Sequence, residues 1–209
     1  MQKSQSTATE YKNIFGFYEM YRALTYLPRA IAKMMRNNKT QLVHPDFIRR
    51  LQLAVTEVNG CPACSYQHTK MALQQGMSNA EIVSFLSGGD EFIKPEEAKG
   101  ILFAQHFADT RGFPKTYTYP SIQQEYGEQQ SEIILSAVQI MLAGNIYGIP
   151  FSAFQSRLKG RSFKDSSLLY EVGMLISGVL MLPLAIIHGL LRGLLGFKNH
   201  RLDKRKVDS

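Results

Sequence analysis

A run of twenty residues without Asp, Glu, Lys or Arg, from Val172 to Leu191, is the strongest constraint on the fold of this 209-residue chain. A helix that is apolar on all sides must be covered by protein or by lipid, because its exposure to water is unfavourable. The run is long enough to cross a bilayer, but Pro183, His188 and several glycines interrupt it. Two interpretations stay open for residues 168–196: a helix packed against other subunits of a soluble homo-oligomer, and a helix in or on a membrane.

The remaining chain is predicted to be helical nearly throughout. Apolar residues recur every three or four positions over residues 11–36, 45–58, 98–108 and 133–142, and no convincing alternating β pattern occurs. Pro28 predicts a break or kink in the first helix, and the stretch from Gly144 to Pro150 predicts an interruption of the longest one. Residues 113–121 predict a loop. We therefore expect an all-α, multi-helical bundle with an extra apolar C-terminal helix.

The only two cysteines, Cys61 and Cys64, form a Cys-x-x-Cys motif that His68 follows. An Asn-Gly pair precedes Cys61 and ends one helix, and Pro62 suits the first turn of the next. Cys61 is then the expected N-cap, and Cys61, Cys64 and His68 share one helix face. Backbone N–H groups and the helix dipole at this end would lower a thiol pKa. The motif therefore predicts a redox dithiol.

Other interpretations of the motif exist. The cysteines could be half of a zinc site, although the chain has no second cysteine pair, and no metal or cofactor is expected. They could also be small core residues, with His68 solvated. A structural disulfide is less typical of a cytosolic chain. A thioredoxin-type site would follow a β-strand, whereas the residues before Cys61 indicate a helix.

The motif also carries a family resemblance. The apolar helix over residues 51–58, the Asn-Gly pair, Cys61, Cys64 and His68, the glycine at 76 and the capped Met-Ser-Asn-Ala-Glu-Ile stretch at 77–82 are similar to the carboxymuconolactone decarboxylase superfamily. Within it, the pattern resembles the alkylhydroperoxidase D-like branch. The resemblance is specific over residues 45–110 and extends to about residue 160. It implies the helical fold of that branch.

The resemblance also implies roles for individual residues. In that branch the second cysteine, here Cys64, attacks a peroxide, the first, here Cys61, resolves it as a disulfide, and the histidine, here His68, relays protons. Family members carry a Glu twelve positions before the first cysteine, where this sequence has Arg49. A guanidinium cannot accept a proton, although it can lower a nearby thiol pKa. Glu57 is the nearest replacement for the base, and it is equally typical of a surface carboxylate.

The resemblance implies a thiol-dependent peroxidase or disulfide reductase that takes a peroxide substrate and a dithiol electron donor. The alternatives are a non-catalytic, oligomeric redox sensor or structural protein that has lost its base, and a lactone decarboxylase, which does not depend on a cysteine pair.

The predicted organisation is a disordered tail at 1–10, a helical domain at 11–160, and an apolar extension with a basic tail at 161–209. The formal charge of +7 is partly concentrated near the C-terminus, where a short basic run is typical of a solvated tail. No nucleic-acid surface is expected. No apolar stretch follows the first ten residues, so we expect a cytoplasmic protein, with membrane association as the alternative.

Overall fold

A computed structural model describes residues 11–203, and the prediction of an all-α fold is confirmed. The described residues hold no β-strand, only an isolated bridge between Lys115 and Asp203. The expected disordered tail at 1–10 lies outside the described residues. The elements are α1 (Phe17–Thr40), α2 (Pro45–Asn59), α3 (Pro62–Gln74), α4 (Asn79–Ser87), the short 3-10 helix η1 (Pro95–Glu97), α5 (Ala98–Asp109), α6 (Thr118–Leu158) and α7 (Leu168–Leu194).

Local sequence signals place the helix ends around the cysteine motif. Gly60 ends α2 with a left-handed φ of 66°, a conformation that glycine adopts without steric cost. Pro62 opens α3, where its missing N–H is no loss. Ser78 caps α4 by accepting a hydrogen bond from the Glu81 N–H at 3.1 Å. These ends fall where the sequence predicts them.

Pro28 does not break α1, and the interruption expected between Gly144 and Pro150 in α6 is wrong. α1 continues through Pro28, and α6 continues through the stretch from Gly144 to Pro150. The non-helical residue in α6 is Gly127, with φ 75° and ψ 170°. Proline removes one backbone hydrogen bond, but burial of the surrounding residues holds the helix together. Ile149 and Ala153, on either side of Pro150, are fully or almost fully buried.

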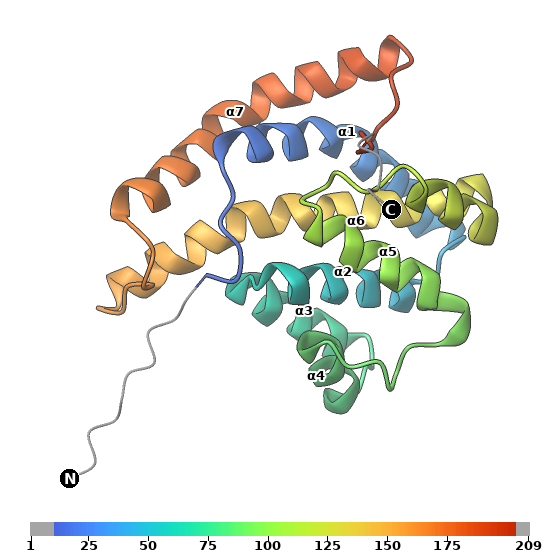
Figure 1. Cartoon of the computed structure of the whole chain (residues 1–209), viewed down its shortest axis with the longest axis horizontal. Helices are drawn as coiled ribbons and strands as arrows, with labels where there is room; N and C mark the ends of the chain where they lie inside the picture. The colour runs from blue at the N-terminus through green and yellow to red at the C-terminus, as the bar shows by residue number, and fades with distance from the viewer. Residues whose placement is uncertain (1–10, 204–209) are drawn as a thin grey trace, which may run out of the picture.

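The long helix α6 is the centre of the fold and contacts α1, α2, α3, α5 and α7. In Figure 1 it crosses the middle of the molecule, with α1 and α7 on one side and α2 to α5 on the other. Its buried residues, such as Ile134, Val138 and Ile146, supply much of the core. Helices that are far apart in sequence therefore pack against α6, and the cysteine helix α3 is one of them.

Among residues 11–203, two helices are long and apolar enough to cross a membrane by length and composition alone. In α6, 78% of the apolar window is buried inside the protein, as in the core helix of a globular fold. In α7 only 22% is buried. α7 lies along α1 so closely that a Cβ added at Gly189 would sit 2.1 Å from the Thr25 carbonyl oxygen. One face of α7 is thus covered by its own chain, and the other remains exposed.

Candidate active site

The two cysteines form a disulfide at the N-terminal end of α3, with their Cα atoms 5.3 Å apart. Cys61 is the N-cap, and its sulfur accepts a hydrogen bond from the Cys64 N–H at 3.3 Å. Cys61 is completely buried, whereas Cys64 is 9% exposed. The sulfur at the helix terminus is therefore stabilised by a backbone N–H, and Cys64 is the more exposed of the two residues.

Helix α6 forms the floor beneath the disulfide. A Cβ added at Gly148 would lie 2.7 Å from Cys64 Sγ and 2.8 Å from Cys61 Sγ, so any side chain there would displace both sulfurs. One turn earlier, the Gly144 carbonyl oxygen lies 3.6 Å from Cys64 Sγ. One turn later, Ser152 Oγ accepts a hydrogen bond from the Ala63 N–H at 3.1 Å.

Sequence reasoning missed these α6 residues. Their signal is the spacing of Gly144, Gly148 and Ser152, small residues four positions apart that share one helix face. Small residues in such a row let another segment approach the helix backbone closely. Here that segment is the dithiol end of α3.

His68, one turn after Cys64 on α3, is bound to Arg49 from α2. Arg49 Nη1 lies 2.7 Å from His68 Nδ1. Because a guanidinium can only donate, Nδ1 must accept, and the neutral ring then carries its proton on Nε2. Burial lowers the pKa of His68 to about 4, and the charge of Arg49 acts in the same direction. At neutral pH His68 is therefore an uncharged Nε2–H donor.

Arg49 is a buried cation, 6% exposed. Its Nε donates to Gln75 Oε1 at 3.0 Å and its Nη1 to Gln52 Oε1 at 2.8 Å. These partners and His68 are neutral, and no carboxylate among residues 11–203 forms an ion pair with Arg49. Burial lowers the pKa of the guanidinium. A positive charge without a counter-ion next to the cysteine helix favours an anion at this site.

Glu57 lies apart from this group. Its carboxylate accepts a hydrogen bond from Lys12 Nζ at 2.6 Å, and the same ammonium group donates to the Glu57 carbonyl oxygen. Its described contacts include neither cysteine and not His68. The structure thus brings together Cys61 and Cys64, and His68 with Arg49, but not Glu57 with either pair. A role for Glu57 as a base stays a prediction.

An open cleft of about 870 Å³ lies beside the start of α3, and neither Cys61, Cys64 nor His68 is among its lining residues. Tyr66 on α3 and Phe151 on α6 line it, and both are exposed. Pro62 and Ala63, which lie between the two cysteines in sequence, form part of its wall. Within residues 11–203, no three His, Cys, Asp or Glu side chains are grouped so that they could hold a metal ion.

The part of the chain that carries the cysteine motif, from α2 to the start of α5, is similar to a known protein family. Residues 45–100 match the carboxymuconolactone decarboxylase family. No curated protein and no solved structure matches the chain.

The carboxymuconolactone decarboxylase segment runs from α2 through η1 into α5 and holds Arg49, Glu57, Cys61, Cys64 and His68. It supports the superfamily that the motif resembles. Gly148 and the helices α1, α6 and α7 lie outside this family segment. The dithiol therefore belongs to the matched segment, whereas its floor is provided by a different part of the chain.

Proposed function

We propose that Cys61 and Cys64 form a redox dithiol that reduces a peroxide or a disulfide, with electrons from an external dithiol. The observation that carries this proposal is the Cys61–Cys64 disulfide at the α3 N-terminus, packed on Gly148. The family match over residues 45–100 supports it, because that family includes the branch whose motif this chain resembles.

The peroxidase cycle has three balanced steps. The Cys64 thiolate attacks the terminal oxygen of a hydroperoxide, the O–O bond breaks, and the leaving alkoxide takes a proton, which leaves a sulfenic acid. The Cys61 thiol then attacks the Cys64 sulfur, the S–O bond breaks, and the released hydroxide takes the Cys61 proton to become water. An external dithiol reduces the new disulfide by exchange and is itself oxidised to a disulfide.

The different exposures of the two sulfurs support these roles. An incoming thiolate or peroxide reaches Cys64 more easily than the fully buried Cys61. When an external thiolate attacks Cys64, the leaving group is the Cys61 thiolate, whose charge the Cys64 N–H and the helix dipole stabilise. A leaving thiol with a lower pKa leaves faster, so the helix cap assists reduction of the disulfide.

Arg49 and His68 have electrostatic roles in this proposal. His68 Nδ1 accepts from Arg49 and cannot collect a proton from a carboxylate, as a Glu-initiated relay requires. Arg49 instead supplies the positive charge that stabilises a thiolate on α3, and His68 Nε2–H is available as a hydrogen-bond donor. This arrangement favours thiol–disulfide exchange over rapid peroxide reduction.

The loss of the acidic residue at position 49 also favours a second candidate, a redox sensor that cycles between dithiol and disulfide without rapid turnover. The test is consumption of hydrogen peroxide and of a small disulfide with dithiothreitol as donor. An enzyme turns over at least one of them, and Cys64→Ser abolishes this activity while Lys70→Gln, an exposed change on the same helix, leaves it intact. Oxidation of the dithiol without turnover would instead identify a sensor, and a dithiol inert to both reagents would contradict the proposal.

A further inference from the structure

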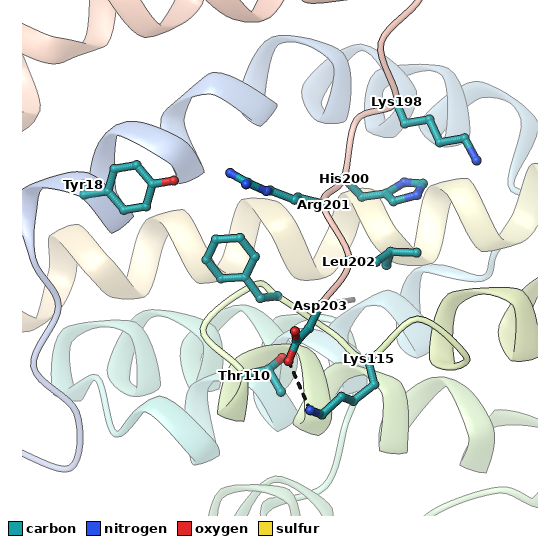
Figure 2. Close-up of a pocket in the computed structure, with 9 residues that line it drawn as sticks. Tyr18, Thr110, Lys115, Lys198, His200, Arg201, Leu202 and Asp203 are labelled. Carbon is teal, nitrogen blue, oxygen red and sulfur yellow. Dashed lines mark hydrogen bonds and ion pairs between the residues drawn. The ribbon is translucent and has the colours of Figure 1, made fainter. Parts of the chain in front are cut away.

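A second hollow lies away from the dithiol, where the chain folds back after α7. Its volume is about 980 Å³, and its walls come from α1, the α5–α6 connection and residues 198–203. Figure 2 shows Arg201 extending from this returning segment toward Tyr18 on α1, with Lys115 and Asp203 joined nearby. The basic C-terminal segment, as far as the structure describes it, is thus one wall of a cavity.

Specific contacts hold that wall in place. Asn199 Nδ2 donates to the Tyr26 carbonyl oxygen and to Gln139 Oε1, both at 3.2 Å. Farther along, the Asp203 N–H donates to the Pro114 carbonyl oxygen at 2.9 Å, and Lys115 pairs with the Asp203 carboxylate at 3.1 Å. Anchors at both ends fix the backbone on either side of Arg201. This wall of the cavity is therefore held in a defined position by contacts with the rest of the fold.

A smaller cavity of about 330 Å³ adjoins the first, and both are lined by Tyr18, His200 and Arg201. The smaller cavity adds Arg22 from α1 and Arg192 from α7. Arg22 Nη1 and Arg192 Nε are buried atoms without a hydrogen-bond partner among the described residues. Arg22 itself is only 8% exposed, so the orphan donor belongs to a guanidinium that is almost wholly removed from solvent.

The other contacts of Arg22 show what its surroundings accept. Its Nη2 donates to the Arg111 carbonyl oxygen, and its guanidinium carbon lies 3.4 Å from the centroid of the Phe113 ring. Phe113 also lines the larger cavity. A cation stacked on an aromatic ring beside an apolar wall suits a ligand that has both an anionic group and an apolar part.

The two cavities carry an excess of positive charge. Arg22, Arg192 and Arg201 make no ion pair with a carboxylate among residues 11–203. The lining contains one acidic residue, Asp203, which binds Lys115. Burial lowers the pKa of Arg22, while Tyr26, Tyr18 and the nearby Glu19 carboxylate act in the opposite direction and Arg201 adds a smaller lowering. Of the three arginines, Arg22 is buried, Arg192 is half-buried and Arg201 is exposed. A buried cation such as Arg22 is ordinarily paired, because an unpaired charge away from water is costly. An anion between these guanidinium groups would supply the missing partner.

We propose that the joined cavities bind a phosphate monoester, with its phosphate facing Arg22, Arg192 and Arg201 and an apolar part against Tyr18 and Phe113. Arginine matches phosphate well because its planar group donates several hydrogen bonds in a fixed geometry. This site shares no lining residue with the cleft beside the dithiol. It is independent of the proposed redox function.

Calorimetry with the full-length protein and phenyl phosphate tests the proposal. We expect binding that Arg201→Gln weakens by about 10- to 100-fold, the range for losing a charged hydrogen bond. Arg22→Gln should weaken it at least as much, and Arg201→Gln keeps the test valid if the buried substitution impairs folding. The matched control is Arg36→Gln, which removes an equal charge from an exposed part of α1 outside both cavities. Phenol, which lacks the anionic group, should not bind.

Binding to lipid vesicles distinguishes the two possible sources of a phosphate monoester, which are a soluble small molecule and a lipid headgroup. Binding of soluble phenyl phosphate that Arg201→Gln weakens supports the site with a small-molecule ligand. Binding only to vesicles that contain phosphatidic acid, lost in Arg201→Gln and absent with phosphatidylcholine alone, supports the same site with a lipid headgroup. Binding that Arg36→Gln weakens as much as Arg201→Gln, or no binding of either probe, would overturn the proposal.

Discussion

At the scale of single residues, Arg49 determines what the cysteine motif can do. It occupies the position where the branch that the motif resembles has a glutamate, and it holds His68 through Nδ1. The motif's resemblance implies the substitution but not its consequence, because Arg49 and His68 lie on different helices. Their contact fixes the histidine in one neutral tautomer. The histidine is therefore an uncharged donor held by a cation, and it has no carboxylate among its described contacts to start a proton relay.

The first prediction concerns the titration of His68. Its pKa of about 4 lies below the ordinary value of 6.5, so the unfolded state binds the proton more readily. As the pH falls from about 6.5 toward about 4, His68 should therefore reduce the free energy of unfolding. NMR of the imidazole nitrogens should show Nε2–H at neutral pH, and Arg49→Met should raise the pKa. A His68 that titrates near 6.5 in the wild type would contradict the Arg49 contact.

The second prediction restores the acidic residue. Arg49→Glu should increase peroxide turnover, because a carboxylate beside His68 raises the histidine pKa and can start a proton relay. The measurement is the initial rate of peroxide consumption with dithiothreitol, with circular dichroism to confirm folding. A folded variant with no gain in rate would show that another group moves the proton.

Glu57→Gln is the companion experiment. A general base contributes about 10²- to 10⁴-fold to a rate, so a loss of that size would identify Glu57 as the base. The ion pair with Lys12 leads us to expect little change in peroxide turnover instead. Lys12→Gln is the matched control, since it removes the other half of the same ion pair.

At the scale of secondary structure, the contact between α3 and α6 holds the dithiol. Gly148→Ala places a Cβ against both sulfurs and should destabilise the oxidised protein by about 1–3 kcal/mol, the usual cost of overpacking. Gly144→Ala is the control, because a Cβ there meets nothing within 4 Å. Thermal unfolding of the two variants checks this prediction. Equal stabilities for the two would contradict the packing of Gly148 on the disulfide.

Sequence patterns predict the helix ends around the cysteine motif better than the interior of α6, although α6 begins at Thr118, inside the loop predicted at 113–121. The Asn-Gly pair, Pro62 and the Ser78 cap act locally, so the ends of α2 and α3 and the start of α4 follow from a few neighbouring residues. The continuity of α6 through Pro150 depends on burial among distant helices, which local signals do not contain. For the same reason the cysteine motif is visible in the sequence, whereas Gly148 is recognisable as part of the site only after folding.

At the scale of the whole molecule, α7 is the long apolar helix whose surface the rest of the chain covers least. Its exposed apolar side chains recur three or four residues apart along one face, as in a helix that packs on another helix. Their exposed fractions lie between 52% and 85%. Soluble monomers rarely expose an apolar patch larger than roughly a few hundred Å². The residues are Ile176, Leu180, Leu184, Ile187, Leu191 and Leu194.

We therefore predict a homo-oligomer in which α7 of one copy packs on α7 of a second. Light scattering after size-exclusion chromatography without detergent should give a single oligomeric mass. Leu184→Glu should shift the protein toward monomer, while Leu102→Glu, which changes an equally exposed leucine on α5, should not. Recovery of the wild type only from the membrane fraction would contradict this assembly and favour a lipid-covered α7.

The central claim is that Cys61 and Cys64 exchange electrons as a pair, with Cys64 reacting first. Mass spectrometry after titrating the reduced protein with peroxide and trapping its thiols tests this most directly. We predict that one equivalent of peroxide removes both alkylatable thiols and that dithiothreitol restores them. Cys61→Ser should stop at a sulfenic acid on Cys64, and Cys64→Ser should not react. A sulfenic acid on Cys61 in Cys64→Ser would reverse the two roles, and two thiols that persist in the wild type would contradict the claim itself.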